Sequence, residues 1–169
     1  MNQNITTIEL FKENMKFSAG HFTIFSATER ENLHGHNFTV YAALTGIVRS
    51  DGLMADYGIF KDKIREMCRE WNETFLLPDS SPHLQLDDSD PSELKAYYGD
   101  ETLKFLPRDV TVIPASNTTL EEMSRVFGER LIQDQALLKG NDILKITIKM
   151  ASGPGQWACW NWIAPWSQA

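Results

Sequence analysis

Residues 34–48 read HGHNFTVYAALTGIV, and this stretch decides the fold. It is rich in β-branched and aromatic residues and ends at the turn-forming run Arg49-Ser50-Asp51-Gly52, a combination typical of a β-strand. Upstream, residues 5–17 alternate in part between apolar and polar side chains, with apolar residues at Ile8 and Leu10 and later at Met15 and Phe17. This alternation predicts a further strand, which can pair with residues 34–48 as a hairpin.

Two amphipathic helices are predicted from the spacing of apolar residues. The first covers about residues 57–72, where one helical face carries Phe60, Ile64, Met67, Cys68 and Trp71. The second runs from Leu120 to near Gly140. It follows Asn117-Thr118-Thr119, whose side chains can cap a helix start, and it places Glu121 and Glu122 in the first turn.

The C-terminal part predicts two more strands, over residues 143–150 and 156–163, joined through Ser152-Gly153-Pro154-Gly155. Between the helices, residues 78–114 are acidic and interrupted by Pro and Gly, so we expect an excursion with a small hairpin. The order of elements predicts an α+β fold, a four-stranded antiparallel sheet with two helices on one face. A single domain over residues 1–169 fits this length.

Composition excludes several classes of protein. With 42% hydrophobic and 23% charged residues the chain is neither disordered nor fibrous, and its net charge of −7 gives no general attraction to nucleic acid or anionic lipid. No apolar stretch reaches membrane-spanning length, and the N-terminus lacks the features of a signal peptide. We therefore expect a soluble cytoplasmic protein without nucleic-acid or membrane partners, in which Cys68 and Cys159 are buried free thiols.

Histidines carry the strongest chemical signal. His34 and His36 are two residues apart, so on a strand both side chains leave the same face, and His21 at the end of the preceding strand can meet them. Three imidazoles suit Zn²⁺ and leave a coordination position open, as in catalytic zinc sites. The alternative is that the His-x-His pair is accidental. His83, beside Pro82, is interpreted as a solvated side chain.

These histidines lie in motifs that resemble the family of 6-pyruvoyl-tetrahydropterin synthase and 6-carboxytetrahydropterin synthase. The resemblance covers most of the chain and rests on Phe17-Ser18-Ala19-Gly20-His21, Leu33-His34-Gly35-His36-Asn37-Phe38, Gly52 to Tyr57, Leu76-Leu77-Pro78, Ile113-Pro114, Asn117 to Glu122 and Pro154-Gly155-Gln156. It implies the tunnelling fold, in which subunits close into a trimeric barrel, commonly stacked as a hexamer, with active sites between subunits. It also implies zinc on the three histidines and a reduced pterin, such as 7,8-dihydroneopterin triphosphate, as substrate.

The resemblance further suggests a catalytic base. Typical members carry a cysteine a few residues before His-Gly-His, whereas residues 29–33 here read Glu-Arg-Glu-Asn-Leu. A variant branch has glutamate in an Arg-Glu-x-Leu-His-Gly-His context and cleaves the side chain to give 6-hydroxymethyl-dihydropterin. Glu31 stands in that position, and we favour it as a general base over the alternative of a solvated loop charge.

Two other positions depart from the family pattern. Glu73 replaces the usual supporting histidine after the first helix, and it is interpreted either as a group that holds a proton or as a surface residue. Residues 150–152 lack the glutamate that anchors the pterin ring, and no acidic residue follows Asp142. Glu121, close to Thr118 and Thr119, can substitute in part as a substrate-binding group, and otherwise it is a charge favoured at a helix start.

Three hypotheses follow for the function. The first is a zinc-dependent lyase that acts on the side chain of a reduced pterin, with Glu31 as base. The second is a retired enzyme that keeps zinc without turnover, and the third is a zinc enzyme of this fold with a non-pterin substrate. The aromatic tail is expected to pack in the core or between subunits in preference to stacking on a ligand; it comprises Trp157, Trp160, Trp162 and Trp166.

Overall fold

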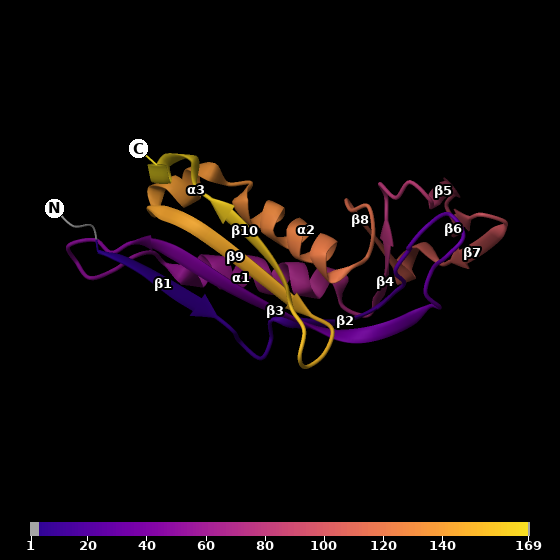
Figure 1. Ribbon diagram of the computed structural model, residues 1–169, viewed down its shortest axis with the longest axis horizontal. Helices are drawn as coiled ribbons and strands as arrows, with labels where there is room; N and C mark the ends of the chain where they lie inside the picture. The colour runs from indigo at the N-terminus through magenta and orange to yellow at the C-terminus, as the bar shows by residue number, and fades with distance from the viewer. Residues whose placement is uncertain (1–3, 169) are drawn as a thin grey trace.

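The fold is an elongated α+β structure, seen here in a computed structural model that describes residues 4–168. Figure 1 shows the two termini at one end and a small sheet at the other. In chain order the elements are β1 (Ile5–Leu10), β2 (Lys16–His21), β3 (His34–Ile47), α1 (Tyr57–Trp71), β4 (Thr74–Pro78), β5 (Gln85–Asp90), β6 (Glu93–Tyr98), β7 (Glu101–Phe105), η1 (Pro107–Asp109), β8 (Val110–Ile113), α2 (Leu120–Ile132), α3 (Gln135–Gly140), β9 (Ile143–Ala151), β10 (Ala158–Ile163) and η2 (Pro165–Gln168).

The main sheet has the strand order β10-β9-β3-β2-β4-β8, and β1 also pairs with β3. Strands β10, β9, β3 and β2 are antiparallel neighbours, which confirms the predicted four-stranded antiparallel sheet as the centre of the fold. β4 and β8 extend this sheet in parallel, so the complete sheet is mixed and larger than predicted.

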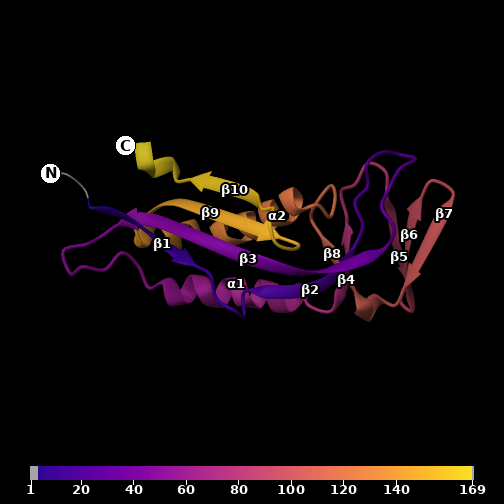
Figure 2. The ribbon, with the colours of Figure 1, turned by 60° about the horizontal axis from the view of Figure 1, so that its bottom comes forward.

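The core lies between this sheet and the helices α1 and α2, which Figure 2 shows against the strands. On β3, Phe38, Val40, Ala42 and Leu44 are fully buried because alternate side chains point toward the helices. The even-numbered residues 34 and 36 of β3 belong to the same row, at the end where burial decreases. The histidines therefore continue the core-facing row beyond the apolar part of the strand.

The single strand predicted over residues 5–17 is wrong, because the structure contains two strands, β1 and β2, separated by a turn in which the N–H of Met15 donates to the carbonyl of Lys12. Both strands pair with the same side of β3. The core-facing residues are even-numbered in β1, as at Leu10, and odd-numbered in β2, as at Phe17. A continuous strand would place one of these sets on the wrong face, so the interruption is required.

The excursion between the helices is larger than the small hairpin expected. β5, β6 and β7 form a separate three-stranded antiparallel sheet, here called the inserted sheet, and β8 returns to the main sheet beside β4. A second apolar cluster joins the inserted sheet to the loop after β2, and its buried members are Phe22, Ile24, Leu77, Leu84, Leu94, Ala96 and Tyr98.

The second predicted helix is divided. α2 ends at Ile132, and the side chain of Asp134 accepts from the N–H of Leu137 to start α3. The predicted N-cap is confirmed, because the hydroxyl of Thr119 accepts from the N–H of Glu122. Within the described residues, no helix combines the length and apolar character needed to cross a membrane.

Of the two free cysteines, only Cys68 is buried as predicted, and burial raises its pKa to about 12. Cys159 is exposed, which corrects the prediction. On β10, Trp160 and Trp162 pack against the core, so alternation turns Cys159 to the opposite face of the sheet.

Candidate functional site

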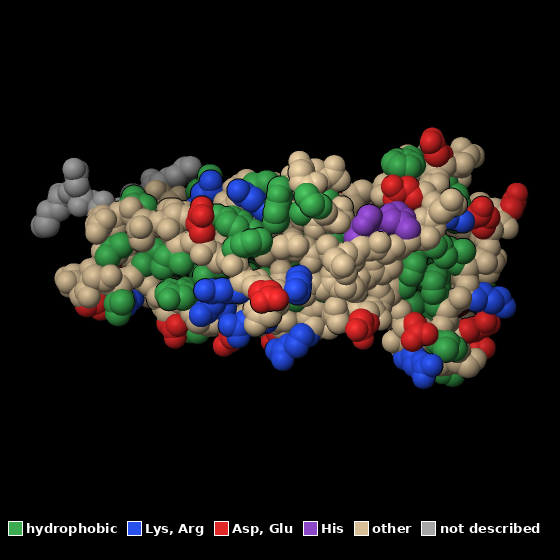
Figure 3. Space-filling view, turned by 90° about the horizontal axis from the view of Figure 1, so that it is seen from below, with side chains coloured by type: hydrophobic (Ala, Val, Ile, Leu, Met, Phe, Trp, Pro, Cys, Tyr) green, Lys and Arg blue, Asp and Glu red, His purple; other side chains and the backbone are tan. Residues whose placement is uncertain are grey.

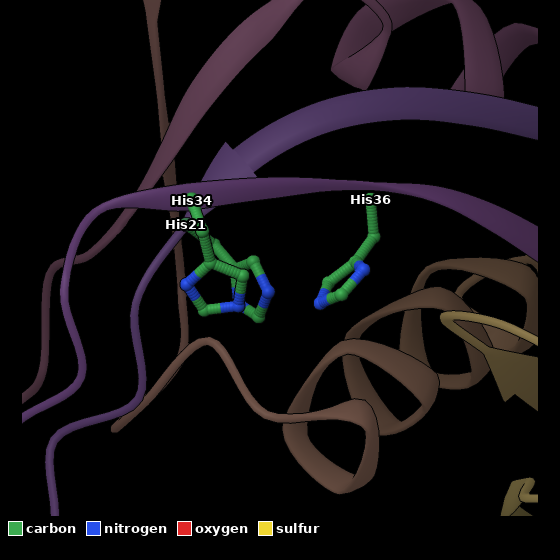
Figure 4. A group of neighbouring side chains, drawn as sticks. All are labelled: His21, His34 and His36. Carbon is green, nitrogen blue, oxygen red and sulfur yellow. The ribbon is translucent and has the colours of Figure 1, made fainter.

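Three imidazoles converge where β2 ends and β3 begins. His21 is the last residue of β2 and pairs with His34, the first residue of β3, while His36 lies two residues further along. Their candidate ligand atoms all lie within 4.8 Å of one another. Figure 4 shows the three rings on the same side of the strands, facing the segment that leads into α2. The strand register thus produces the cluster that the sequence predicted.

Backbone carbonyls orient two of these rings. Nδ1 of His21 donates to the carbonyl of Thr118 at 2.9 Å, and Nδ1 of His34 donates to the carbonyl of Asn32 at 2.8 Å. Because a carbonyl only accepts, each Nδ1 carries the hydrogen and each neutral ring keeps a lone pair on Nε2. This is the arrangement by which proteins commonly orient metal-binding histidines.

The buried Nε2 of His21 supports metal binding independently. It has no hydrogen-bond partner among the described residues, and His21 is only 6% exposed. Burial, above all, lowers the pKa of His21, the charges of His34 and His36 lower it further, and the bond to Thr118 opposes them. The neutral imidazole is the form that binds metals. An unsatisfied nitrogen beside two other imidazoles fits a metal ion such as zinc.

Glu31 lies directly beside the cluster, with Oε2 3.9 Å from Nε2 of His34. The N–H of Thr23 donates to this Oε2 at 2.8 Å, and the N–H of Glu31 donates to the carbonyl of Thr23 at 2.8 Å. Partial burial raises the pKa of Glu31, but hydrogen bonding from Thr23 and the charges of His34 and His21 outweigh it, so the net pKa is lowered. Glu31 is therefore an ionised acceptor near neutral pH.

A pocket of about 380 Å³ opens over these groups, a size that suits a small organic ligand. Figure 3 shows histidine side chains reaching the surface beside carboxylates. The start of α2 and the turn between β9 and β10 complete the pocket, whose lining residues are His21, Thr23, Glu31, His34, His36, Phe38, Thr119, Leu120, Glu121, Ser152, Gln156, Trp157 and Ala158.

The predicted substrate-binding residues occupy different positions. Thr119 and Glu121 line the pocket. Thr118 is fully buried; its hydroxyl donates to the carbonyl of Phe22 at 2.7 Å and its own carbonyl holds His21. In this structure Thr118 therefore orients a histidine and does not face the pocket.

Glu73, the second predicted catalytic residue, lies outside the pocket. It is exposed, and it lines a neighbouring hollow together with Asn37 and Phe75. Of the residues that line this hollow, His36 also lines the histidine pocket. The structure of one chain therefore separates Glu73 from Glu31.

The sequence left two features of the pocket open. Trp157 does not pack in the core, because it is 45% exposed and lines the pocket, while the three later tryptophans pack against the core as predicted. Packing of Trp157 between subunits stays a prediction. Trp157 lies just before β10 begins, where strand alternation gives no guidance. The role of Thr23 depends on its backbone N–H, which every residue except proline has, so its side chain gave no signal.

The sequence profile of the 6-pyruvoyl tetrahydropterin synthase family matches residues 9–160, which include every residue that lines the pocket. The chain belongs to this family. Its curated relatives include a protein of Methanocaldococcus jannaschii provisionally named 6-carboxy-5,6,7,8-tetrahydropterin synthase, 26% identical over 86% of this chain and 89% of the relative. The family assignment agrees with the resemblance deduced from the histidine motifs.

Solved structures of two members of this family superpose closely on the chain. The 6-pyruvoyl tetrahydropterin synthase of Plasmodium falciparum has a TM-score of 0.88 and 28% identity, covering 96% of this chain and all of that chain. That of Plasmodium vivax has a TM-score of 0.88 and 27% identity, covering 95% and 99%. The P. vivax structures include variants in which a catalytic glutamate is replaced by alanine or by cysteine.

Proposed function

We propose that this chain is a zinc-dependent lyase that acts on the side chain of a reduced pterin such as 7,8-dihydroneopterin triphosphate. The observation that carries the proposal is the carboxylate of Glu31, 3.9 Å from Nε2 of His34 at the edge of a three-imidazole cluster. Family membership and the names of the Plasmodium relatives support the pterin substrate.

The proposed zinc ligands are His21, His34 and His36. Bound zinc supplies Lewis-acid polarisation of substrate oxygens, which makes a neighbouring carbon-bound proton easier to remove. The protein's contribution is to hold neutral imidazoles in fixed orientations through the carbonyls of Thr118 and Asn32.

Glu31 is the proposed general base. Thr23 engages its Oε2, whereas no hydrogen bond within residues 4–168 engages its Oε1, which leaves that oxygen to accept a proton from the substrate side chain. The catalytic glutamate of the P. vivax relative supports this role. Because this chain has glutamate before His-Gly-His, we propose side-chain cleavage to 6-hydroxymethyl-dihydropterin as its reaction.

The remaining pocket residues are proposed to bind the ring. Glu121 presents an exposed carboxylate that can accept N–H groups of a pterin, and Thr119 lines the same pocket. The half-exposed indole of Trp157 offers a face for stacking. Thr118 serves as a positioning residue for His21.

A second candidate is a zinc enzyme or retired zinc protein of this fold that does not turn over a pterin. It is favoured by the turn between β9 and β10, which contributes the neutral Ser152 and Gln156 to the pocket where the family resemblance predicts an anchoring glutamate. A neutral side chain there weakens discrimination for the amino groups of a pterin.

The function test is a product assay. Zinc-loaded protein is incubated with 7,8-dihydroneopterin triphosphate, and the pterin product is identified by mass. We expect 6-hydroxymethyl-dihydropterin, with turnover reduced at least about 100-fold in Glu31→Gln because a general base typically contributes that much. A 6-pyruvoyl or 6-carboxy product would refute the proposed cleavage, and no product at all would favour the second candidate.

Metal binding is predicted separately from turnover. His34→Ala removes one of three proposed ligands, so the purified protein is expected to lose most of its zinc in elemental analysis. His83→Ala is the matched control, since His83 is an exposed histidine outside the pocket. Equal zinc content in both variants would show that the three-histidine site is wrong.

A further inference from the structure

Arg30 connects the loop that carries Glu31 to the inserted sheet. The guanidinium carbon of Arg30 lies 5.4 Å from the ring centre of Phe22 and 5.7 Å from that of Tyr98, so the group is stacked against two aromatic rings. Its side chain is only 16% exposed. Phe22 follows β2 and Tyr98 ends β6, so Arg30 sits between the two parts of the protein.

The polar contacts of Arg30 point in two directions. Nη1 donates to the backbone carbonyl of Glu31 at 2.8 Å. Nε donates to Oε2 of Glu101, at the start of β7, at 2.9 Å, and Nη2 contacts the same oxygen. The planar guanidinium can serve both partners at once because its donors form a rigid fork.

The inserted sheet makes a second contact with this loop. The hydroxyl of Tyr98 donates to the carbonyl of Ser26 at 2.8 Å. Asn117, in the segment before α2, also bonds to this loop: its side chain accepts from the N–H of Ile24 at 3.1 Å and donates to the carbonyl of Ile24 at 2.7 Å. The loop that carries Glu31 is thus hydrogen-bonded both to the segment before α2 and to the inserted sheet.

Three hydrogen bonds, two with Thr23 and one with Arg30, fix the position of Glu31. Thr23 engages its N–H and its carboxylate, and Arg30 engages its carbonyl. Of these three bonds, only the one from Arg30 connects Glu31 to the inserted sheet, because Arg30 also bonds to Glu101. Small displacements of a catalytic group reduce rate strongly, so a fixed peptide at Glu31 has a direct functional value.

We propose that Arg30, held in place by Glu101 and Tyr98, is a positioning residue for Glu31. The inserted sheet then helps to fix the loop that carries Glu31. This inference rests on the proposed role of Glu31 as base. It gives a function to the acidic excursion over residues 78–114, whose place in the protein the sequence left open.

The test uses Glu101→Gln in the full zinc-loaded protein. Glu101 is 54% exposed, so this change preserves the fold while it removes the charged acceptor that holds Arg30. We expect kcat to fall about tenfold with little change in KM and unchanged zinc content, because the base is displaced while the metal and ring contacts remain. Hydrogen exchange of backbone amides in residues 22–33 should accelerate about tenfold.

The matched control is Glu70→Gln. Glu70 pairs with Arg130 at 2.6 Å between α1 and α2 and is 44% exposed. Outside α1, its hydrogen bonds within residues 4–168 go to Thr111 and Arg130 and not to residues 22–33. Glu70→Gln should leave both kcat and exchange in residues 22–33 unchanged. Arg30→Lys keeps the charge but cannot donate to Glu31 and Glu101 together, so it should behave like Glu101→Gln.

The proposed role of Arg30 would be overturned if Glu101→Gln had the kcat and the amide exchange rates of the parent protein. It would also be overturned if Arg30→Lys had the kcat of the parent protein. The exchange measurement needs no turnover. If the parent protein gives no product, the proposed function fails, and the exchange rates of residues 22–33 still decide whether Arg30 fixes the loop.

Discussion

Glu73 has a backbone conformation that is unfavourable for residues other than glycine. Its φ is 60°, in the left-handed region, where a residue with a Cβ pays roughly 1 kcal/mol relative to glycine. Such strain often persists where a side chain has a function. Its N–H donates to the carbonyl of Ser18 at 2.7 Å, which holds the backbone in place.

We predict that Glu73→Gly raises the free energy of unfolding by about 0.5–1 kcal/mol in urea titrations and lowers the rate of product formation. Asp142→Gly is the control, because Asp142 also has a positive φ, of 51°, but lines neither the histidine pocket nor the neighbouring hollow that contains Glu73. It should gain stability without losing activity. Full activity in Glu73→Gly would identify Glu73 as a surface residue.

At the scale of residues, the sequence could predict the side chains whose chemistry is visible in their type. His21, His34 and His36 were found because strand periodicity places residues two apart on one face. Thr118 was assigned to the substrate, yet it acts through its carbonyl, and a backbone group leaves no mark in the sequence. The sequence marks Arg30 only as part of a motif, because its partner Glu101 lies 71 residues away.

At the scale of elements, α2 and β10 pack closely because position 128 is glycine. A Cβ placed on Gly128 would overlap the ring of Trp160, which packs against the core. Trp160 is a large and partly buried ring, so it has little room to shift. The close approach of the helix to the last strand therefore depends on the absence of a side chain.

We predict that Gly128→Ala lowers the free energy of unfolding by about 1–3 kcal/mol, despite the higher helix propensity of alanine, because overpacking dominates. Thermal unfolding of Gly128→Ala and of the control described next measures the change in stability. Gly140→Ala at the end of α3 is the control, since no atom lies within 4 Å of its added Cβ, and it should be neutral or stabilising by up to about 1 kcal/mol. Equal melting temperatures would contradict the packing argument.

The elements that sequence patterns could predict are those with a single uninterrupted period. α1 was predicted within one residue of its observed limits. The break between β1 and β2 was missed because it depends on pairing with β3. The parallel pairing of β4 with β8 joins residues that are more than 30 positions apart, and short apolar runs do not specify their partners.

At the scale of the whole molecule, the described chain leaves exposed surface suited to association. β10 forms one end of the main sheet, so one edge of this strand is unpaired within residues 4–168. Ile163 on β10 is 60% exposed and Ile5 on β1 is 52% exposed. Unpaired strand edges and exposed apolar side chains favour contact with another sheet edge. These features agree with the family resemblance, and we propose that identical subunits close into a trimer, or a hexamer of two trimers.

Such an assembly would also resolve the separation of the two proposed catalytic carboxylates. Glu31 lines the histidine pocket and Glu73 lines the neighbouring hollow of the same chain. For both to act on one substrate, we propose that Glu73 comes from the adjacent subunit. A site between subunits then contains Glu31 of one chain and Glu73 of another, so each defective chain can supply the residue that the other lacks.

This arrangement predicts complementation between inactive variants. Glu31→Gln and Glu73→Gln are each expected to turn over slowly alone, whereas subunits of the two, unfolded together in equal amounts and refolded with zinc, should form about a quarter of their sites with both carboxylates intact, because the pairing at each interface is random. The rate of product formation before and after co-refolding measures this. Separately refolded proteins, mixed afterwards, provide the control. If co-refolding restores no activity while each variant binds zinc fully, Glu31 and Glu73 do not serve a shared site.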